Sequence, residues 1–447
     1  MQGRNTVRRE KGVEMRAVVV GSGAGGATAA RELALNGFEV TILEAGEPFS
    51  PLTHKISWFR SLRGTWLLKD ATNIKRVFPH YQVTRSSDDL FIMTGITEGG
   101  CTSISCGNMV RAENGLSEIG LDLTPEFEEL EQELTINPVP REKWRPLTQN
   151  MFDKAKELGY DPKPTPKVGD IKKCIGCGYC ELGCVTGAKW DSRRAYKDLI
   201  GKGVSLQTSS RVQKVILEGA RAKGVLVTHG SNIERVDADV VVLSAGGIGT
   251  AQILKASNLP SKDNMWVDVV LTVGGVSKGA RMLNEPPMVW FAKREKYILS
   301  PYFDILSFWF HKPWKEVPLE NRVGMMIKLA DTENGIVAAD GRVIKSLTKV
   351  DRERLEDAKV EATRIMEASG VEGPYVDGMI NGGHVGGTVS LSKDDVQSMR
   401  PSWLPKDLWV ADLSLMPRSQ GLPTMLTTAA LSLHVTRKII NEKAVKQ

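Results

Sequence analysis

The chain has 447 residues, 41% of them hydrophobic and 25% charged, which is enough for two or three globular domains with large buried cores. Its 59 basic and 53 acidic residues give a net charge of +6 without any block of lysine and arginine, which argues against a nucleic-acid partner. No run of about 18 apolar residues occurs, so the sequence predicts no transmembrane segment.

Residues 1–14 are polar and basic and lack the apolar stretch of a signal peptide. We therefore expect a disordered leader before the first domain, and a cytoplasmic protein. In the cytoplasm thiols stay reduced, so clustered cysteines favour a metal site over disulfides.

Residues 15–44 have the pattern of a dinucleotide-binding unit. An apolar run at 17–20 predicts a buried parallel strand, and a helix and a second strand at 40–43 follow it. The turn before the helix has the G-x-G-x-x-G pattern, with Gly21, Gly23 and Gly26. These glycines allow a tight turn and let a pyrophosphate approach the helix N-terminus. Glu44 follows the second strand, where it can accept the ribose hydroxyls, and its charge disfavours the 2′-phosphate of NADP.

The six cysteines of the chain fall in two segments. TEGGCTSISCGNMVR, at 97–111, holds Cys101 and Cys106 among glycines and small hydroxyl residues, and we expect both thiols to be buried and neutral. KCIGCGYCELGC, at 173–184, holds the other four cysteines with the spacing C-x2-C-x2-C-x3-C. These four are Cys174, Cys177, Cys180 and Cys184.

This spacing, on a loop with three glycines, is typical of thiolates that converge on the irons of a cubane cluster. Zinc sites more often use two C-x2-C pairs separated by a longer loop. In ferredoxins with two clusters the fourth cysteine serves the other cluster, and this chain has no second set. The sequence favours one [4Fe-4S] cluster on these four cysteines, with a structural zinc, no metal or a disulfide arrangement as alternatives.

Strand-to-helix patterns recur later in the chain. VVVLSAGGIGTAQILKASN, at 240–258, is an apolar run that breaks into glycines and then a helix. The segment 407–439 reads as a strand, an acidic residue at Asp412, a proline-rich turn and a closing helix.

Between these two patterns, residues 262–380 contain strand and hairpin signals and an amphipathic helix that ends at Gly370. The stretch SPYFDILSFWFHKPW, at 300–314, is rich in aromatic residues. It could line a substrate pocket or bind a partner, although core packing is the simpler explanation.

Taken together, these segments and their order resemble the glucose-methanol-choline (GMC) family of FAD oxidoreductases. The resemblance implies an α/β fold with a Rossmann-type FAD-binding domain, of the GMC and p-hydroxybenzoate-hydroxylase kind, and a smaller α+β substrate domain built on an antiparallel sheet. It divides the chain into an FAD-binding domain of 15–115, 191–261 and 381–441, a substrate domain of 116–172 and 262–380, and a cysteine-rich loop at 173–190.

The same resemblance assigns cofactor-binding positions. Those that line the flavin are Gly99, Gly100, Cys101, Thr102, Ser103 and Asn108. Val212 falls where the family's backbone meets the adenine. Ala245 and Gly246 fall where the chain passes the dinucleotide, and Asp412 and Leu413 lie at the stretch beside the ribityl and pyrophosphate groups.

His384 matches the family's histidine that faces the flavin, in the pattern H-x-x-G-T. The residues alone also favour it as a general base, because it lies in a glycine-rich loop and imidazole titrates near working pH. We expect structural roles for the other histidines, which are His54, His80, His229, His311 and His434.

The chain departs from the family after the final strand. There the family usually has an Asn or a second His that shares the substrate hydroxyl, whereas this chain has Leu422 or Pro423. Neither residue can hydrogen-bond through its side chain. His384 must therefore act alone or with a partner from elsewhere in the chain.

The sequence predicts an FAD-dependent dehydrogenase that oxidises a CH–OH group of a small molecule, with His384 as the base. The cluster would pass electrons one at a time to a redox protein partner. Two alternatives remain open. One is a reductase of a carbonyl or double bond, and the other is an electron-transfer subunit without alcohol chemistry.

Overall fold

The computed structural model describes residues 15–53, 71–86, 88, 90–304 and 317–444. The predicted leader at 1–14, His54 and His311 lie outside the described residues, as does most of the aromatic stretch at 300–314.

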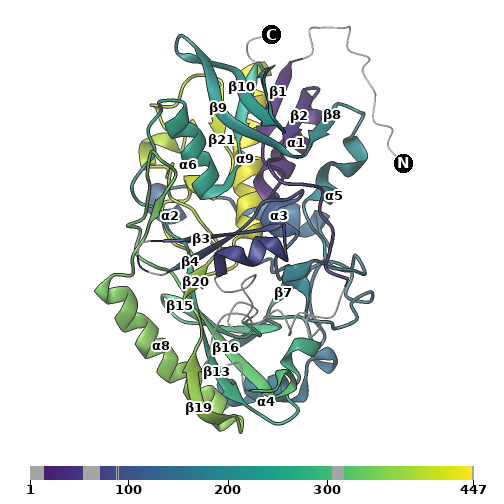
Figure 1. Cartoon of the computed structure of the whole chain (residues 1–447), viewed down its shortest axis with the longest axis vertical. Coiled ribbons are helices and arrows are strands. Elements are labelled where there is room, and N and C mark those ends of the chain that lie inside the picture. Colours follow the sequence, from purple (N-terminus) through teal and green to yellow (C-terminus); the bar gives the residue numbers. More distant parts are fainter. Residues whose placement is uncertain (1–14, 54–70, 87, 89, 305–316, 445–447) are drawn as a thin grey trace.

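A five-stranded parallel sheet forms the dinucleotide half of the molecule, in the order β21-β12-β1-β2-β8 (Figure 1). Its strands are β1 (Arg16–Val20), β2 (Glu39–Leu43), β8 (Val204–Gln207), β12 (Val240–Leu243) and β21 (Leu408–Val410). Helix α1 (Ala24–Leu35) packs against the closing helix α9 (Met425–Ala444). Because β12 is fully buried and β1 nearly so, both read as continuous apolar runs, as parallel strands covered on two faces do.

Further elements complete this half. A three-stranded antiparallel sheet contains β9 (Ser210–Glu218), β10 (Arg221–His229) and β11 (Asn232–Asp237). The helices are α2 (Leu116–Ile119), α3 (Thr124–Glu133), α5 (Arg193–Tyr196) and α6 (Gly246–Ala256). A strand pair joins β5 (Ile136–Pro138) to β7 (Pro166–Val168).

A nine-stranded sheet forms the other half (Figure 1). Its order is β3-β4-β20-β13-β16-β15-β14-β6, and β19 also pairs with β13. The strands are β3 (Tyr81–Arg85), β4 (Phe91–Gly95), β6 (Pro162–Pro164), β13 (Val269–Val276), β14 (Trp290–Lys293), β15 (Tyr297–Pro301), β16 (Arg322–Leu329), β19 (Glu372–Asp377) and β20 (Asn381–Gly382). A short hairpin of β17 (Ile336–Val337) and β18 (Val343–Ile344) lies outside this sheet.

The two faces of β16 meet different surroundings. Val323, Met325, Ile327 and Leu329 belong to the apolar core that also contains the buried face of α8 (Lys349–Ala368). Met326, on the opposite face, packs in a separate cluster with Leu422 from the segment after β21. Successive side chains alternate across a strand, so this second face of the sheet is turned toward the dinucleotide half.

The α/β fold class is confirmed, and the structure differs from the expected domain bounds in two places. Strands β3 and β4, assigned above to the FAD-binding domain, pair within the nine-stranded sheet. Helix α3, assigned to the substrate domain, instead packs on α9 through Phe127 and Leu130. In both cases a long-range partner decides the placement, and local sequence carries no information about it.

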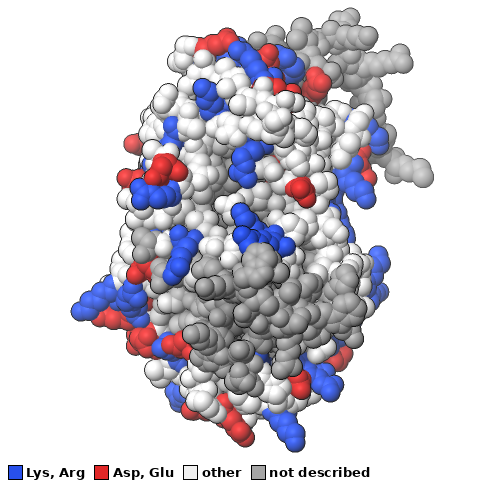
Figure 2. Space-filling model, viewed as in Figure 1, with Lys and Arg blue, Asp and Glu red and all other residues white. Residues whose placement is uncertain are grey.

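The surface agrees with the composition. Figure 2 shows acidic and basic side chains interspersed on the viewed face. Within the described part of the chain, no helix combines the length and the apolar character that crossing a membrane requires.

Candidate active site

The glycine-rich turn after β1 is packed so tightly that side chains cannot replace Gly21, Gly25 or Gly26. Gly21 has φ +99°, and a Cβ atom built on Gly26 would lie 1.9 Å from the carbonyl oxygen of Gly21. A Cβ atom on Gly25 would lie 2.0 Å from the carbonyl oxygen of Ala411. Gly23 caps the N-terminus of α1 without a side-chain hydrogen bond. The first N–H groups of α1 thus form a site suited to an anion.

The segment 97–103 lies directly against this turn. A Cβ atom on Gly23 would have the Cα of Gly100 as its nearest neighbour, at 4.0 Å, and Gly99 donates its N–H to the hydroxyl of Ser22 at 2.9 Å. The Thr102 hydroxyl donates to the carbonyl of Gly99, and Ser103 is buried beside it. The residue Cys101 is exposed, contrary to the expectation, although its sulfur accepts the N–H of Gly95 and burial raises the pKa of its thiol.

Glu44 lies at the carboxyl end of β2, as predicted. Its Oε2 accepts hydrogen bonds from the backbone N–H and hydroxyl of Ser22, at 3.0 and 2.7 Å. Its Oε1 accepts from the N–H of Gly46 at 2.9 Å. Burial raises the pKa of Glu44, and these hydrogen bonds oppose that shift. The carbonyl of Glu44 also receives the N–H of Ser210, which brings β9 and its buried residue Val212 alongside.

The predicted residues from the later segments converge on the same place. Asp412 accepts hydrogen bonds from the N–H of Gly246 at 2.9 Å and from the hydroxyl of Thr250 at 2.7 Å. Its other oxygen accepts the N–H of Ser414. Ala245, which precedes α6, lies beside Gly21, and Leu413 is buried within the core of this half. Four segments distant in sequence therefore surround the N-terminus of α1.

Two glycine substitutions separate cofactor binding from folding. Gly23→Ala should leave the fold intact, because its backbone is extended and no atom lies closer than 4.0 Å to the added Cβ, but the methyl group would block a pyrophosphate. We expect FAD binding to weaken by at least about tenfold. Gly26→Ala should instead destabilise the protein by more than about 3 kcal/mol. Fluorescence titration with FAD and thermal melting of each protein measure the two effects, and tight FAD binding by the Gly23 variant would contradict this assignment.

Asn108 does not stand free beside the turn. Its Oδ1 accepts a hydrogen bond from the buried Lys167 ammonium at 2.5 Å, and its Nδ2 contacts the sulfur of Met288 at 3.1 Å. Asn108 thus joins the dinucleotide half to the nine-stranded sheet.

His384 lies in the loop after β20, where the two halves meet. Its Nδ1 lies 3.2 Å from Oδ2 of Asp268, and about a third of its side chain (34%) is exposed. Burial and the charge of Lys328 lower its pKa, while Asp268 and the backbone of Leu422 act in the opposite direction. The net shift is downward, so the imidazole is neutral at neutral pH.

Asp268 was not anticipated from the sequence. It is fully buried, has φ +51°, and directly precedes β13. Its Oδ1 accepts hydrogen bonds from the hydroxyl of Ser419 and from the N–H groups of Gln420 and Gly421, all at 2.7–2.8 Å. Burial alone would raise its pKa, but Lys328, His384 and these donors outweigh that effect and keep the carboxylate ionised.

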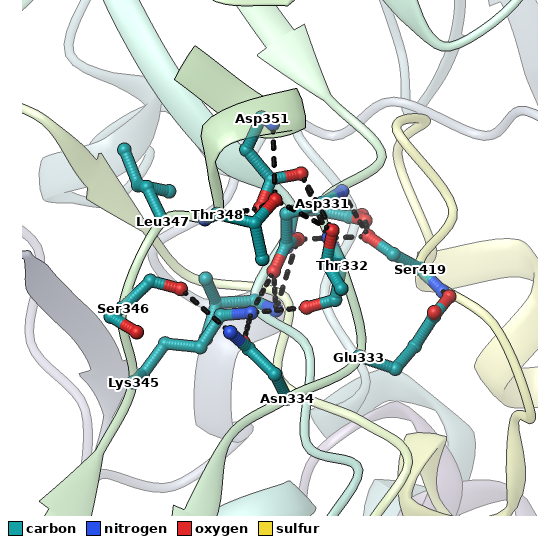
Figure 3. Close-up of polar contacts among 12 residues, drawn as sticks. Asp331, Thr332, Glu333, Asn334, Lys345, Ser346, Leu347, Thr348, Asp351 and Ser419 are labelled. Carbon is teal, nitrogen blue, oxygen red and sulfur yellow. Dashed lines mark hydrogen bonds and ion pairs between the residues drawn. The ribbon is translucent and has the colours of Figure 1, made fainter.

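A second group of buried charged residues holds residues 419–421, the loop that donates hydrogen bonds to Asp268. Figure 3 shows Asp331 between Lys345 and Ser419, with Thr348 and Asp351 near it at the start of α8. The Lys345 ammonium lies 2.7 Å from Asp331 and also donates to Asn334 and to the carbonyl of Thr332. Since all three of its N–H bonds have acceptors, Lys345 fixes this group in place.

Leu422 occupies the position where a second polar residue would be expected. Its side chain is 7% exposed and packs with Met326, Met288 and Ile298. These four side chains form an apolar wall on the side of the site next to His384.

The cysteine-rich loop folds back on the flavin-lining segment. Gly176, Gly178 and Gly183 all have positive φ, which supplies the predicted sharp turns. The buried Lys189 ammonium donates to the carbonyl of Cys180 and to three carbonyls of residues 102–105. The loop is therefore tied to the segment around Cys101.

The four thiols do not form a metal site in this arrangement. Among the residues that the structure describes, no three His, Cys, Asp or Glu side chains are placed to hold one metal ion. Burial raises the pKa of the Cys180 thiol to about 12. For Cys184 burial acts the same way, but hydrogen bonds from Lys189 N–H and Thr186 prevail and lower its pKa. The described residues therefore do not support the predicted [4Fe-4S] cluster.

Glu181, inside the cysteine run, contacts two residues outside it through its carboxylate. Both of its carboxylate oxygens lie 2.9 Å from the hydroxyl of Tyr302, and the Cys106 sulfur lies 3.5 Å from one of them. Burial raises the pKa of Glu181 to about 7. The loop thus reaches the nine-stranded sheet through this side chain.

Comparison with known proteins agrees with this geometry. The family model described as GMC oxidoreductase matches residues 15–278. An uncharacterized protein (MJ1450) of Methanocaldococcus jannaschii is 26% identical over 428 residues, which cover 94% of this chain and 99% of that protein. A long-chain-alcohol oxidase (FAO3) of Arabidopsis thaliana is 25% identical over 415 residues, or 79% of this chain. The chain spans only 53% of the length of that plant enzyme.

The fold also resembles a solved flavoenzyme structure. Pyridoxine 4-oxidase from Mesorbium loti superposes with a TM-score of 0.73 and 17% identity, over 95% of this chain and 99% of that one. The family match extends over more than half of the sequence and includes the glycine turn, Glu44 and the cysteine-rich loop. The chain belongs to the GMC oxidoreductase family of FAD-dependent enzymes.

Proposed function

We propose that this enzyme oxidises a CH–OH group of a small, largely apolar alcohol and uses His384 as the base. The observation that carries the proposal is a neutral imidazole, oriented by an ionised carboxylate, where the two halves of the molecule meet. FAD, when bound, supplies the acceptor for the hydride that leaves the substrate carbon.

The described residues fit this cofactor. The N-terminus of α1 and the glycines around it would hold the pyrophosphate, and Glu44 would face the ribose. Val212 would lie near the adenine, and residues 99–103 would line the flavin. Asp412 fixes the start of α6 against this site through Gly246 and Thr250.

His384 would hold the substrate proton. If Nδ1 donates to Asp268, the lone pair stays on Nε2, and that atom accepts the hydroxyl proton. The ionised carboxylate then stabilises the imidazolium that forms.

The substrate side favours apolar alcohols. Met326, Met288 and Leu422 line the wall between the sheet and the site, and they offer contact area without hydrogen bonds. The relatives support the same choice, since one is named a long-chain-alcohol oxidase.

An anaerobic panel tests this proposal directly. The FAD-loaded protein would be mixed with 1-decanol, benzyl alcohol and pyridoxine, and flavin absorption followed with time. Bleaching by at least one of them, with the aldehyde formed in equal amount, is expected. The reductase alternative is favoured if no alcohol bleaches the flavin but the dithionite-reduced protein is reoxidised by the matching aldehyde.

The pH dependence should report His384. Because its pKa is lowered from 6.5, the base form persists into mild acid, and kcat/KM should fall only below that value. We expect an acid limb with its midpoint below pH 6.5, measured from pH 4.5 to 8 with the fastest alcohol of the panel. A midpoint above pH 7 would contradict a desolvated His384.

Electron transfer through an iron–sulfur cluster is a separate hypothesis to which we assign no step. The positive φ values of the loop glycines favour it, whereas the described residues place no three possible ligands around one metal ion. About four irons and four acid-labile sulfides per flavin would restore it and the redox partner it implies. Purified protein with full flavin but neither iron nor sulfide would leave the loop a structural link to the flavin-lining segment.

A further inference from the structure

Lys328 is a charged residue within the apolar strand β16. It is only 4% exposed, and every other residue of β16 is buried as well. The alternation of the strand places it on the same face as Met326, which packs with Leu422. Its charge acts on His384, and Cys106 and Asp331 influence its own pKa. Lys328 therefore lies at the wall where the second polar residue of the family is missing.

The hydrogen bonds of Lys328 are incomplete, unlike those of the other buried lysines in the described part of the chain. Its ammonium has one contact, Oδ2 of Asp268 at 3.4 Å. By contrast, the ammonium groups of Lys167, Lys189, Lys345 and Lys443 each have two or more acceptors. An ammonium has three N–H donors, and leaving two of them unpaired inside a protein is costly. A buried ammonium with unpaired N–H donors is suited to bind an oxygen atom of a ligand.

We propose that Lys328 donates a hydrogen bond to the substrate oxygen on the reacting carbon, and so takes the role that Leu422 cannot fill. The inference rests on the proposed alcohol oxidation. The substrate O–H bond breaks, its proton goes to Nε2 of His384, and the ammonium of Lys328 stabilises the negative charge left on oxygen.

The charges around Lys328 are consistent with this role. Asp268 holds both His384 and Lys328 through the same oxygen, Oδ2. One carboxylate therefore positions an acceptor for the proton and a donor for the oxygen. Burial lowers the pKa of Lys328, and Asp268 and Asp331 counter that shift.

Two substitutions of Lys328 and one control test the proposal. Lys328→Met removes the donor, Lys328→Gln keeps a neutral donor, and Lys293→Met changes an exposed lysine on β14 of the same sheet. With the fastest alcohol, the rate of flavin reduction should fall by about 100-fold in the Met variant and less in the Gln variant. The acid limb of the pH profile should also move upward in the Met variant, because a positive charge beside His384 is lost. Lys293→Met should leave both measurements unchanged.

A binding measurement that needs no turnover completes the test. Acetate, a small oxyanion, should perturb the flavin spectrum of the wild-type protein and bind at least about tenfold more weakly to Lys328→Met. Equal acetate binding by the two proteins, or none by the wild type, overturns the proposal. If acetate binds as expected but no alcohol is oxidised, Lys328 still binds a substrate oxygen and only the proposed reaction fails.

Discussion

Replacing His384 with alanine should abolish flavin bleaching by alcohols while leaving bleaching by dithionite intact. The substrate then keeps its hydroxyl proton until solvent takes it, so the reductive rate should fall by about 10²–10⁴-fold. Stopped-flow absorption at the flavin band measures both reactions on the same sample. The fold should persist, because His384 lies in a loop and only Asp268 bonds its ring through a side chain.

The matched control for this substitution is His434→Ala. Its Nδ1 lies 3.0 Å from a carboxylate oxygen of Glu126, a contact much like that of His384 with Asp268. This pair joins α9 to α3, away from the nine-stranded sheet. The control should alter thermal stability and leave the reductive rate unchanged. Equal rate losses in the two variants would mean that His384 acts only in folding.

The dinucleotide unit could be predicted because its signals are local. The glycine turn, the two flanking strands and Glu44 lie within 30 residues, and each follows from rules of backbone geometry. The amphipathic helix ending near Gly370 was predicted for the same reason, and α8 ends at Ala368. Domain bounds failed where β3 and α3 take partners distant in sequence.

The charged centre of the site could not be predicted in the same way. Asp268 and Lys328 lie 60 residues apart in apolar stretches, and only the pairing of β13 with β16 brings those stretches together. One signal was present in each case, a single charge within a run of Val, Leu, Met and Ile. A buried charge of this kind needs a partner, which is a reason to search for it.

The cysteine run shows the limit of an inference from ligand spacing. The spacing of the thiols along the sequence limits the backbone conformations of the loop. It does not predict the contacts of Lys189 and Glu181, which fix the position of the loop. In this structure Lys189 donates a hydrogen bond to the carbonyl of Cys180, and Glu181 accepts one from the hydroxyl of Tyr302. The spacing of possible ligands along the sequence is therefore not sufficient to establish a cluster.

Asp268→Asn should separate the stabilising role of the carboxylate from its role in catalysis. An amide can keep one oxygen on the hydroxyl of Ser419 and on the backbone of residues 420–421, so the loop should stay in place. Its NH2 group would then face His384, favour the tautomer with the lone pair on Nδ1, and remove the base from Nε2. We expect a loss of about 10³–10⁴-fold in the reductive rate, as for other histidines whose carboxylate partner becomes an amide.

The same change leaves the ammonium of Lys328 buried without its counter-ion, which should cost about 3–5 kcal/mol of stability. The double variant Asp268→Asn with Lys328→Met removes the orphaned charge, so most of that stability should return while activity stays low. Urea unfolding and stopped-flow reduction, applied to both variants, measure the two quantities independently. If the double variant recovers the rate together with the stability, Asp268 serves only as a counter-ion. If neither variant is destabilised, the Lys328–Asp268 contact is not an ion pair in solution, and the unpaired donors of Lys328 require another explanation.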